Sequence, residues 1–466
     1  MPGFPSLLAH WPLLVVGLSV AFVSSQAADP AAPSPNKLPK IVVDVAHKGF
    51  MNEKGERFIP VGVNYYRPDT GWAPQFWKKM DVETTRRDFQ KMKELGINVV
   101  RVFVTYGSFY SQPGQLDAEG LAKFDQLLDI ADEFGIYVHP TGPEGWEMMP
   151  EWTNPLGNVH ANHGNEVSLK SLEDYWTMFA GRYRGRSTIW AYDLKNEPSV
   201  IWDSADSQKK WDEWRTAHGQ PFVPVPAKDA EPSEIVADYQ RFRESLAKAW
   251  VARQAKAIKA ADPKALVTVG LLQWSVPAQP VTLDQYAAFR PEVVAPHLDF
   301  VSLHFYPLAK GIYRYTGPDA ENANLSVLES MVRECAKPGK PVVIGEFGWY
   351  GGGPLDPGGE PASEDQQAEW GKRLVEVTAP MVSGWFNWGL YDTPEAKDVS
   401  RLTGLLTFDG QEKVWGKEYA PLIKSMPVPS GIPVRPDLPW GTATVDELAS
   451  ERFQAEYLEA FRNAQP

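Results

Sequence analysis

Cysteine is almost absent from this sequence of 466 residues, in which Cys335 is the single example. A framework of intramolecular disulfides is therefore excluded, and a buried small hydrophobe is the simplest role for this thiol. No group of cysteines and histidines has the spacing of metal ligands. We accordingly expect neither a metal nor a cofactor.

Positive charge is also in short supply, with 46 Lys and Arg against 59 Asp and Glu and a formal net charge of −13 at pH 7. Nucleic acids and anionic membranes both require a basic patch, so neither is expected as a partner. Hydrophobic residues make up 43% of the chain, which is ordinary for a globular protein. No internal repeat is visible, and we expect a monomer.

The N-terminal segment predicts export. Residues 11–23 form an apolar run too short to span a bilayer comfortably, and small residues follow at 25–27. This pattern is typical of a secretory signal peptide over residues 1–27, which implies a secreted or periplasmic protein. No Lys or Arg precedes the run, so an uncleaved N-terminal anchor is the alternative. Residues 28–40 are rich in Ala and Pro and predict a disordered spacer.

Two predicted strands end in glutamate. The first, Trp-Ala-Tyr-Asp-Leu-Lys-Asn-Glu, ends at Glu197 because Pro198 cannot continue a ladder. The second is a β-branched run that ends at Glu346, between Gly345 and Gly348. Catalytic groups of parallel barrels sit at the carboxyl ends of strands. Two carboxylates in such positions are what glycoside hydrolysis requires, one as proton donor and one as nucleophile or base.

These motifs resemble the retaining glycosidases of the clan that includes glycoside hydrolase family 5, over about residues 41–425. In that clan an Asn-Glu-Pro on strand four supplies the acid/base, matched here by Asn196 and Glu197, and a glutamate on strand seven supplies the nucleophile, matched by Glu346. The resemblance also implies a (β/α)8 barrel.

Alternating strand and helix patterns independently predict an α/β fold of eight units, a (β/α)8 barrel over residues 41–426. A hairpin turning at 54–55 is expected to cap the bottom of the barrel. The expected strands are 58–66, 98–104, 136–139, 189–197, 265–270, 299–306, 341–347 and 382–388, and the clearest helices are 81–95, 121–134, 171–184, 234–261, 324–335, 364–378 and 414–425.

Two connections, 141–167 after strand three and 199–233 after strand four, are unusually long. Long loops at the carboxyl ends of barrel strands are usually functional, so we expect them to wall a substrate cleft. Their tryptophans either line that cleft or simply pack the loops down; they are Trp146, Trp152, Trp202, Trp211 and Trp214. Residues 427–466 are predicted as a Pro-rich extension with one helix that packs on the barrel.

The polar residues at the other strand ends have roles that the resemblance supports position by position. Arg101 and the Tyr306 hydroxyl are expected to keep Glu346 ionised. Glu197 begins protonated, because burial and the charge of Glu346 raise its pKa. The remaining residues are expected to bind sugar hydroxyls, orient the glutamates or stack on a sugar ring, and they are His139, Asn196, His304 and either Trp388 or Trp385.

The sequence therefore predicts an exported retaining glycoside hydrolase that acts on a polysaccharide or oligosaccharide. β-1,4-Mannan and β-1,4-glucan are the commonest substrates of the family, and nothing in the residues separates them. A transglycosylase would use the same site. A non-catalytic carbohydrate-binding barrel is disfavoured, because a binding protein has no need of two opposed carboxylates. A metal-dependent barrel hydrolase lacks its clustered ligands.

Overall fold

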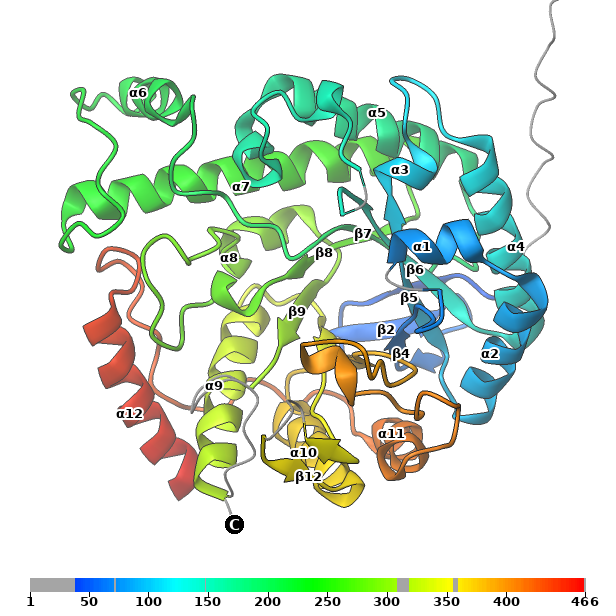
Figure 1. The fold of residues 1–466 in the computed structure, drawn as a ribbon. Coiled ribbons are helices and arrows are strands. Elements are labelled where there is room, and N and C mark those ends of the chain that lie inside the picture. Colours follow the sequence, from blue (N-terminus) through cyan, green and yellow to red (C-terminus); the bar gives the residue numbers. More distant parts are fainter. Residues whose placement is uncertain (1–37, 71–72, 147, 308–317, 355–358, 465–466) are drawn as a thin grey trace, which may run out of the picture. The chain divides into compact units, whose positions relative to one another are not determined.

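The computed structural model describes residues 38–70, 73–146, 148–307, 318–354 and 359–464. These residues form a closed barrel of eight parallel strands with helices around it, so the predicted (β/α)8 fold is confirmed (Figure 1). The strands, in their order around the barrel, are β4 (Val61–Asn64), β5 (Val99–Thr105), β6 (Tyr137–Glu144), β7 (Ala191–Asn196), β8 (Leu266–Leu271), β9 (Val301–Phe305), β10 (Val342–Phe347) and β13 (Gly384–Asn387).

Local signals set the helix ends. Helix α10 begins with a capping box in which Ser363 and Gln366 exchange hydrogen bonds. Helix α4 ends at Gly135, whose φ of 71° is the left-handed conformation that glycine adopts most readily. The helices are α1 (Ala73–Lys79), α2 (Val82–Glu94), α3 (Tyr106–Phe109), α4 (Ala118–Phe134), α5 (Glu166–Arg182), α6 (Ser207–Ala217), α7 (Glu234–Ala261), α8 (Pro291–Val294), α9 (Pro318–Ala336), α10 (Glu364–Thr378), α11 (Val414–Ser425) and α12 (Glu447–Asn463).

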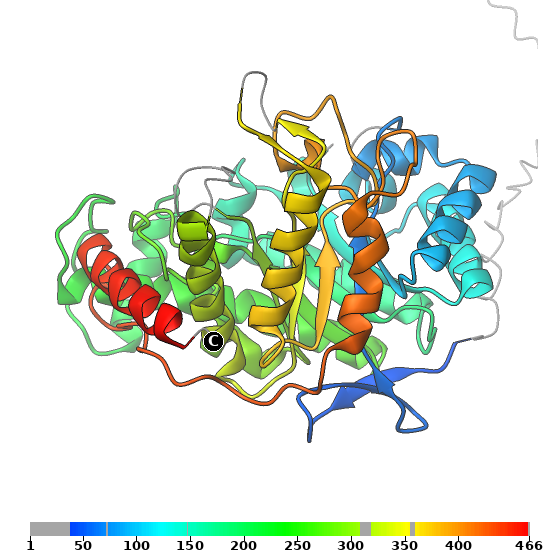
Figure 2. The ribbon, with the colours of Figure 1, turned by 90° about the horizontal axis from the view of Figure 1, so that it is seen from below.

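A small antiparallel sheet closes the amino end of the barrel (Figure 2). It consists of β1 (Ile41–Asp44), β2 (Gly49–Asn52) and β3 (Arg57–Phe58) and contains the predicted hairpin. The Phe50 ring packs edge-on against Trp190 and Phe300, with ring centroids 5.2 and 5.3 Å apart. The hairpin therefore seals the hydrophobic lower layer of the barrel interior. A further two-stranded sheet, β11 (Gly353–Pro354) with β12 (Pro361–Ala362), follows β10.

The segment before β1 lies partly outside the described residues. The predicted signal peptide and residues 28–37 of the predicted spacer are not described. The last three spacer residues, 38–40, are held against the barrel: Ser187 donates to the Leu38 carbonyl, and the Tyr137 hydroxyl donates to the Pro39 carbonyl at 2.7 Å. Within the described ranges, no helix is long and apolar enough to cross a membrane.

The insertion after β7 contains a helix, α6, where the sequence predicted an irregular loop. This helix packs against α7, because Trp211 meets Tyr239 and Phe242 of α7 at ring distances of 5.2 and 5.5 Å. Trp202 contacts Tyr239 as well, and Trp214 stacks on Trp211. The expectation that these three tryptophans wall the cleft is therefore wrong, since they attach the insertion to α7.

The C-terminal extension follows α11 and ends in α12, which packs against α9 (Figure 1). The Tyr457 hydroxyl donates to Glu329 at 2.9 Å, and Arg333 of α9 donates to the carbonyl oxygens of Pro433 and Pro436. Phe461 is fully buried in the main hydrophobic core. The extension thus covers α9 on the outside of the barrel.

Candidate active site

Glu197 follows the last residue of β7 and has an unusual backbone. Its φ is 47°, a left-handed conformation that costs a residue other than glycine roughly 1–2 kcal/mol. The Glu197 amide donates to the Gly270 carbonyl of the neighbouring strand at 2.9 Å, which holds this conformation. Non-glycine residues in this region cluster at functional sites. The turn leaves the Glu197 side chain 29% exposed at the carboxyl end of the barrel.

Glu346 lies near the end of β10 and is almost completely buried. Arg101 Nη1 donates to its Oε1 at 2.6 Å, and the Tyr306 hydroxyl donates to its Oε2 at 2.9 Å. Both oxygens of the carboxyl group therefore have a donor, as expected for a carboxylate that stays ionised. The structure brings together the two residues that the sequence assigned to Glu346 as donors.

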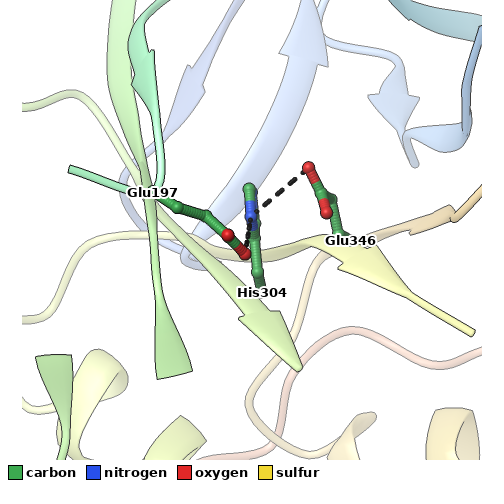
Figure 3. A group of neighbouring side chains, drawn as sticks. All are labelled: Glu197, His304 and Glu346. Carbon is green, nitrogen blue, oxygen red and sulfur yellow. Dashed lines mark hydrogen bonds and ion pairs between the residues drawn. The ribbon is translucent and has the colours of Figure 1, made fainter. Parts of the chain in front are cut away.

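His304 of β9 lies between the two glutamates (Figure 3). Its Nδ1 is 3.1 Å from Glu197 Oε1 and 3.4 Å from Glu346 Oε1. One oxygen of Glu197 and one of Glu346 lie within 4.8 Å of each other. Retaining glycosidases have carboxyl groups about 5–5.5 Å apart and inverting enzymes about 6.5–9.5 Å. The separation here is on the retaining side.

Arg101 connects the site. Its guanidinium has five N–H groups, and each donates a hydrogen bond. Nε and Nη2 bind one oxygen of Asp193 at 3.1 and 2.8 Å. Nη1 binds Asn64 and Glu346, and the other N–H of Nη2 binds the Asn196 side chain at 3.0 Å. Arg101 therefore orients residues from β4, β7 and β10 at once.

Burial raises the pKa of both glutamates. It raises the pKa of Glu197 to about 7, and the charge of Glu144 adds to this rise while Arg101 opposes it. From the sequence, the charge of Glu346 was expected to raise the pKa of Glu197, whereas in the structure the contributing anion is Glu144. Burial and the charge of Glu197 also raise the pKa of Glu346, while His304, Arg101 and the Tyr306 hydroxyl oppose the rise. Burial lowers the pKa of His304 to about 4, so this imidazole is neutral at neutral pH.

Aromatic side chains line one side of the site. Trp388 packs with Tyr66 and Phe103 in a cluster that Tyr306 also contacts, and its indole N–H donates to Ser400 at 3.0 Å. Trp146 is 39% exposed, and its ring lies 5.1 Å from Phe103. Of the loop tryptophans, Trp146 thus adjoins this aromatic cluster, whereas Trp152 packs against Tyr110.

Two predicted substrate contacts lie elsewhere. His139 is buried in the lower layer against Trp190, and its Nδ1 lies 2.8 Å from the Ala191 carbonyl oxygen, because β6 continues for five residues beyond it. Trp385 points out of the barrel, where its indole donates to Thr378 of α10. Side chains alternate along β13, so the inward position at the strand end belongs to Trp388. His139 and Trp385 are therefore corrected to structural roles.

Sequence reasoning missed Glu144, which occupies the end of β6 where His139 was expected. Its two oxygens accept from the Asn196 amide and from Lys195. The segment before it, Pro-Thr-Gly-Pro, looks like a loop, and this obscured the strand. A carboxylate placed immediately before a long loop was the available signal.

One group of side chains among the described residues could hold a metal ion, and it is the site itself: Glu197, His304 and Glu346. The Arg101 guanidinium, 2.6 Å from Glu346, already occupies one lone pair of that carboxylate. Its positive charge would also repel a divalent cation. The arrangement favours acid/base and nucleophilic chemistry by the two glutamates.

Residues 51–393 match the family model for cellulase, glycosyl hydrolase family 5. The chain belongs to glycoside hydrolase family 5. The match spans the barrel from the bottom hairpin to the segment after β13, and includes Arg101, Glu197 and Glu346.

Relatives of this family 5 chain are similar to it at low identity. The mannan endo-1,4-beta-mannosidase F of Aspergillus clavatus is 22% identical over 325 residues, which cover 64% of each chain. An exo-beta-1,4-mannosidase from Opitutaceae bacterium strain TAV5 has a TM-score of 0.59 and 21% identity over 82% of this chain and 61% of its own. GH5_18 from Streptomyces cattleya, in complex with GlcNAc, has a TM-score of 0.63 and 18% identity over 86% of this chain and 90% of its own. This chain thus spans less than two thirds of the length of the curated relative from Aspergillus clavatus.

Proposed function

We propose that this protein hydrolyses β-glycosidic bonds with retention of configuration, by double displacement at Glu346 and Glu197. The approach of their carboxyl oxygens to within 4.8 Å is the observation that carries the proposal. This spacing allows direct attack on the anomeric carbon and leaves no room for a water on the far side of the sugar.

In the first step, Glu346 attacks the anomeric carbon while Glu197 gives its proton to the leaving oxygen. The bond to the leaving group breaks, and a covalent glycosyl ester forms on Glu346. Arg101 and Tyr306 bind Glu346 from the side of the protein, which directs the carboxylate at the sugar. Asn196, fixed by Arg101, is placed to bond a sugar hydroxyl beside the anomeric carbon.

In the second step, Glu197 is ionised and removes a proton from water, which attacks the anomeric carbon and releases Glu346. Formation of the ester removes the negative charge of Glu346, so Glu197 can act as a base. His304 lies between the two carboxyl groups and is neutral, so it can donate a hydrogen bond without competing as the proton source.

The preferred substrate in this proposal is a β-1,4-linked mannoside. Support comes from the names of the relatives, a mannan endo-1,4-beta-mannosidase and an exo-beta-1,4-mannosidase. Trp146, 39% exposed beside Phe103, provides a face on which a sugar ring can stack. β-1,4-Glucan is the competing substrate.

The test measures sugar release from β-mannan, β-glucan and xylan by wild type, Glu346→Ala and Glu197→Ala. We expect release from mannan and its loss in both variants. Azide then separates their roles. With an activated β-glycoside, azide takes the place of the missing nucleophile in Glu346→Ala, expels the leaving group and gives an α-glycosyl azide. In Glu197→Ala the ester still forms on Glu346, and azide then displaces Glu346 to give a β-glycosyl azide. Activity that survives in Glu346→Ala without azide would overturn the nucleophile assignment.

We also propose that the protein is exported. The apolar run at 11–23 and the small residues at 25–27 support this. N-terminal sequencing of protein recovered outside the cytoplasm should begin near residue 28. Recovery of the intact N-terminus in a membrane fraction would favour the uncleaved anchor.

A further inference from the structure

Glu144 is a buried carboxylate that the two-glutamate reaction does not use. It is the last residue of β6 and is 1% exposed. Between Phe103 and Thr105 of β5, the pairing with β6 advances by one extra residue, so β6 has a bulge immediately before Glu144. A Cβ at Gly142 would lie 2.3 Å from the Val104 carbonyl oxygen, so this bulge requires glycine. The bulge sets the direction of the Glu144 side chain.

Both oxygens of Glu144 bind the segment that carries the proposed general acid. Oε1 accepts the backbone N–H of Asn196 at 2.7 Å. Oε2 accepts from Lys195 Nζ at 2.8 Å, and the Lys195 side chain is itself 10% exposed. These two partners directly precede Glu197. The turn at Glu197 is therefore backed by a buried ion pair between Glu144 and Lys195.

The backbone of Glu197 needs this support. Its left-handed conformation persists only when neighbouring groups hold it in place. Gly270 accepts the Glu197 amide, Arg101 binds the Asn196 side chain, and Glu144 binds the Asn196 amide. Glu144 is the one anion among these three anchors.

We propose that Glu144 is a positioning residue for the general acid: through Asn196 it fixes the backbone that carries Glu197, and with Lys195 as its counter-ion it holds a negative charge beside that carboxyl group. This role rests on the function proposed above. The buried ion pair of Glu144 and Lys195 thereby joins the residues that determine the protonation of Glu197.

Charged groups from four strands face Glu197: Arg101 of β5, Glu144 of β6, His304 of β9 and Glu346 of β10. Burial raises the pKa of Glu197 most, and of the anions Glu144 contributes to that rise. Glu144 also interacts electrostatically with three other titratable groups, namely Lys195, His160 and Tyr106. Burial lowers the pKa of His160, so this imidazole is neutral where the enzyme would work.

Two substitutions with opposite expected effects test the proposal. Glu144→Gln keeps an oxygen that accepts the Asn196 amide and removes the charge, so the pKa of Glu197 should fall. Lys195→Met leaves Glu144 without its counter-ion, so the pKa of Glu197 should rise. We expect the alkaline limb of the kcat/KM profile to move down by about one pH unit in Glu144→Gln and up in Lys195→Met. A purely structural disturbance would lower the rate without moving the limb in opposite directions.

The same shifts are measured without turnover, by 13C NMR titration of the Glu197 carboxyl group, assigned by its absence in Glu197→Gln. Glu456→Gln, the same change on an exposed position of α12, is the control and should leave the titration unchanged. Folded variants in which neither substitution moves the Glu197 titration, or both move it the same way, would overturn the proposal. If Glu144→Gln does not fold, the direction of the Lys195→Met shift decides.

The two proposals fail separately. A wild-type protein that releases no sugar but shows the opposite NMR shifts would refute the hydrolase proposal, and only the electrostatic coupling of Glu144 to Glu197 would remain. Wild-type hydrolysis that Glu346→Ala abolishes, together with an unmoved Glu197 titration in both variants, would refute only the role of Glu144.

Discussion

Nη1 of Arg101 lies 2.6 Å from Oε1 of Glu346, and the two side chains are 0% and 4% exposed. The pair lies inside the barrel, where a charge without a partner is expensive. Asp193 shares the guanidinium: burial works against its ionisation, but Arg101, His139 and His304 together outweigh this effect and lower the pKa of Asp193. The cation therefore stabilises two carboxylates, one that would react with substrate and one below it.

Arg101→Lys should damage both activity and stability. A lysine keeps the charge but has three donors on one nitrogen, so it cannot bind Asp193, Asn196 and Glu346 together. We expect kcat to fall roughly 100-fold and the free energy of unfolding to fall by about 3 kcal/mol. Urea unfolding and steady-state kinetics measure the two effects. Arg86→Lys, on the outside of α2, is the matched control and should change neither.

The rate should fall on the alkaline side with a midpoint near pH 7. Glu197 must carry a proton to assist the leaving group, and burial raises its pKa to about 7. Above that pH the proton is lost, and kcat/KM declines tenfold per pH unit. A dinitrophenyl leaving group needs no proton. With a dinitrophenyl glycoside, the rate of the bond-cleavage step should therefore not decline on the alkaline side. An alkaline limb that is the same for good and poor leaving groups would contradict the assignment of Glu197 as acid.

Glu197→Gln should change stability in a pH-dependent manner. The pKa of Glu197 is raised on folding, so its contribution is fully present below the unfolded pKa of about 4.5 and is lost as pH rises through about 7. The urea midpoint of the variant, relative to wild type, should therefore rise between pH 5 and pH 8. An unchanged difference across this range would mean that the folded pKa is not raised.

Two tryptophans should respond in opposite ways to replacement by alanine. Trp146 is exposed beside Phe103, so Trp146→Ala should raise KM several-fold with little loss of stability. Trp211 is fully buried against α7, so Trp211→Ala should lower the free energy of unfolding by about 3–5 kcal/mol and leave KM unchanged. Kinetics and urea unfolding on both variants give the comparison. A raised KM in Trp211→Ala would restore the cleft-wall interpretation of the insertion.

Much of the barrel is readable from sequence because its periodic segments have clear ends. The predicted helices 234–261, 364–378 and 414–425 have the observed bounds of α7, α10 and α11. The proximity of Glu197 and Glu346 also follows from sequence, because the carboxyl ends of parallel strands meet at one face.

The departures have physical causes that a pattern does not record. Gly142 and Pro143 mark a loop by composition, yet they form a bulge inside β6, and this moved the strand end from His139 to Glu144. A four-residue strand such as β13 fixes side-chain parity only through its register with neighbours, so Trp385 and Trp388 could not be separated. Helix α6 depends on tryptophans that meet α7, a contact between distant segments.

Closure of the barrel joins β4 to β13, where Val61 pairs with Trp385 and Val63 with Asn387. A ribosome releases the chain from its amino end, so β4 emerges long before its second neighbour. During that interval one edge of β4 has unpaired backbone groups that another nascent chain could bind. Folding of this protein should therefore finish only after residue 387 leaves the exit tunnel. A chaperone that shields the open sheet during synthesis would raise the yield more than one added afterwards.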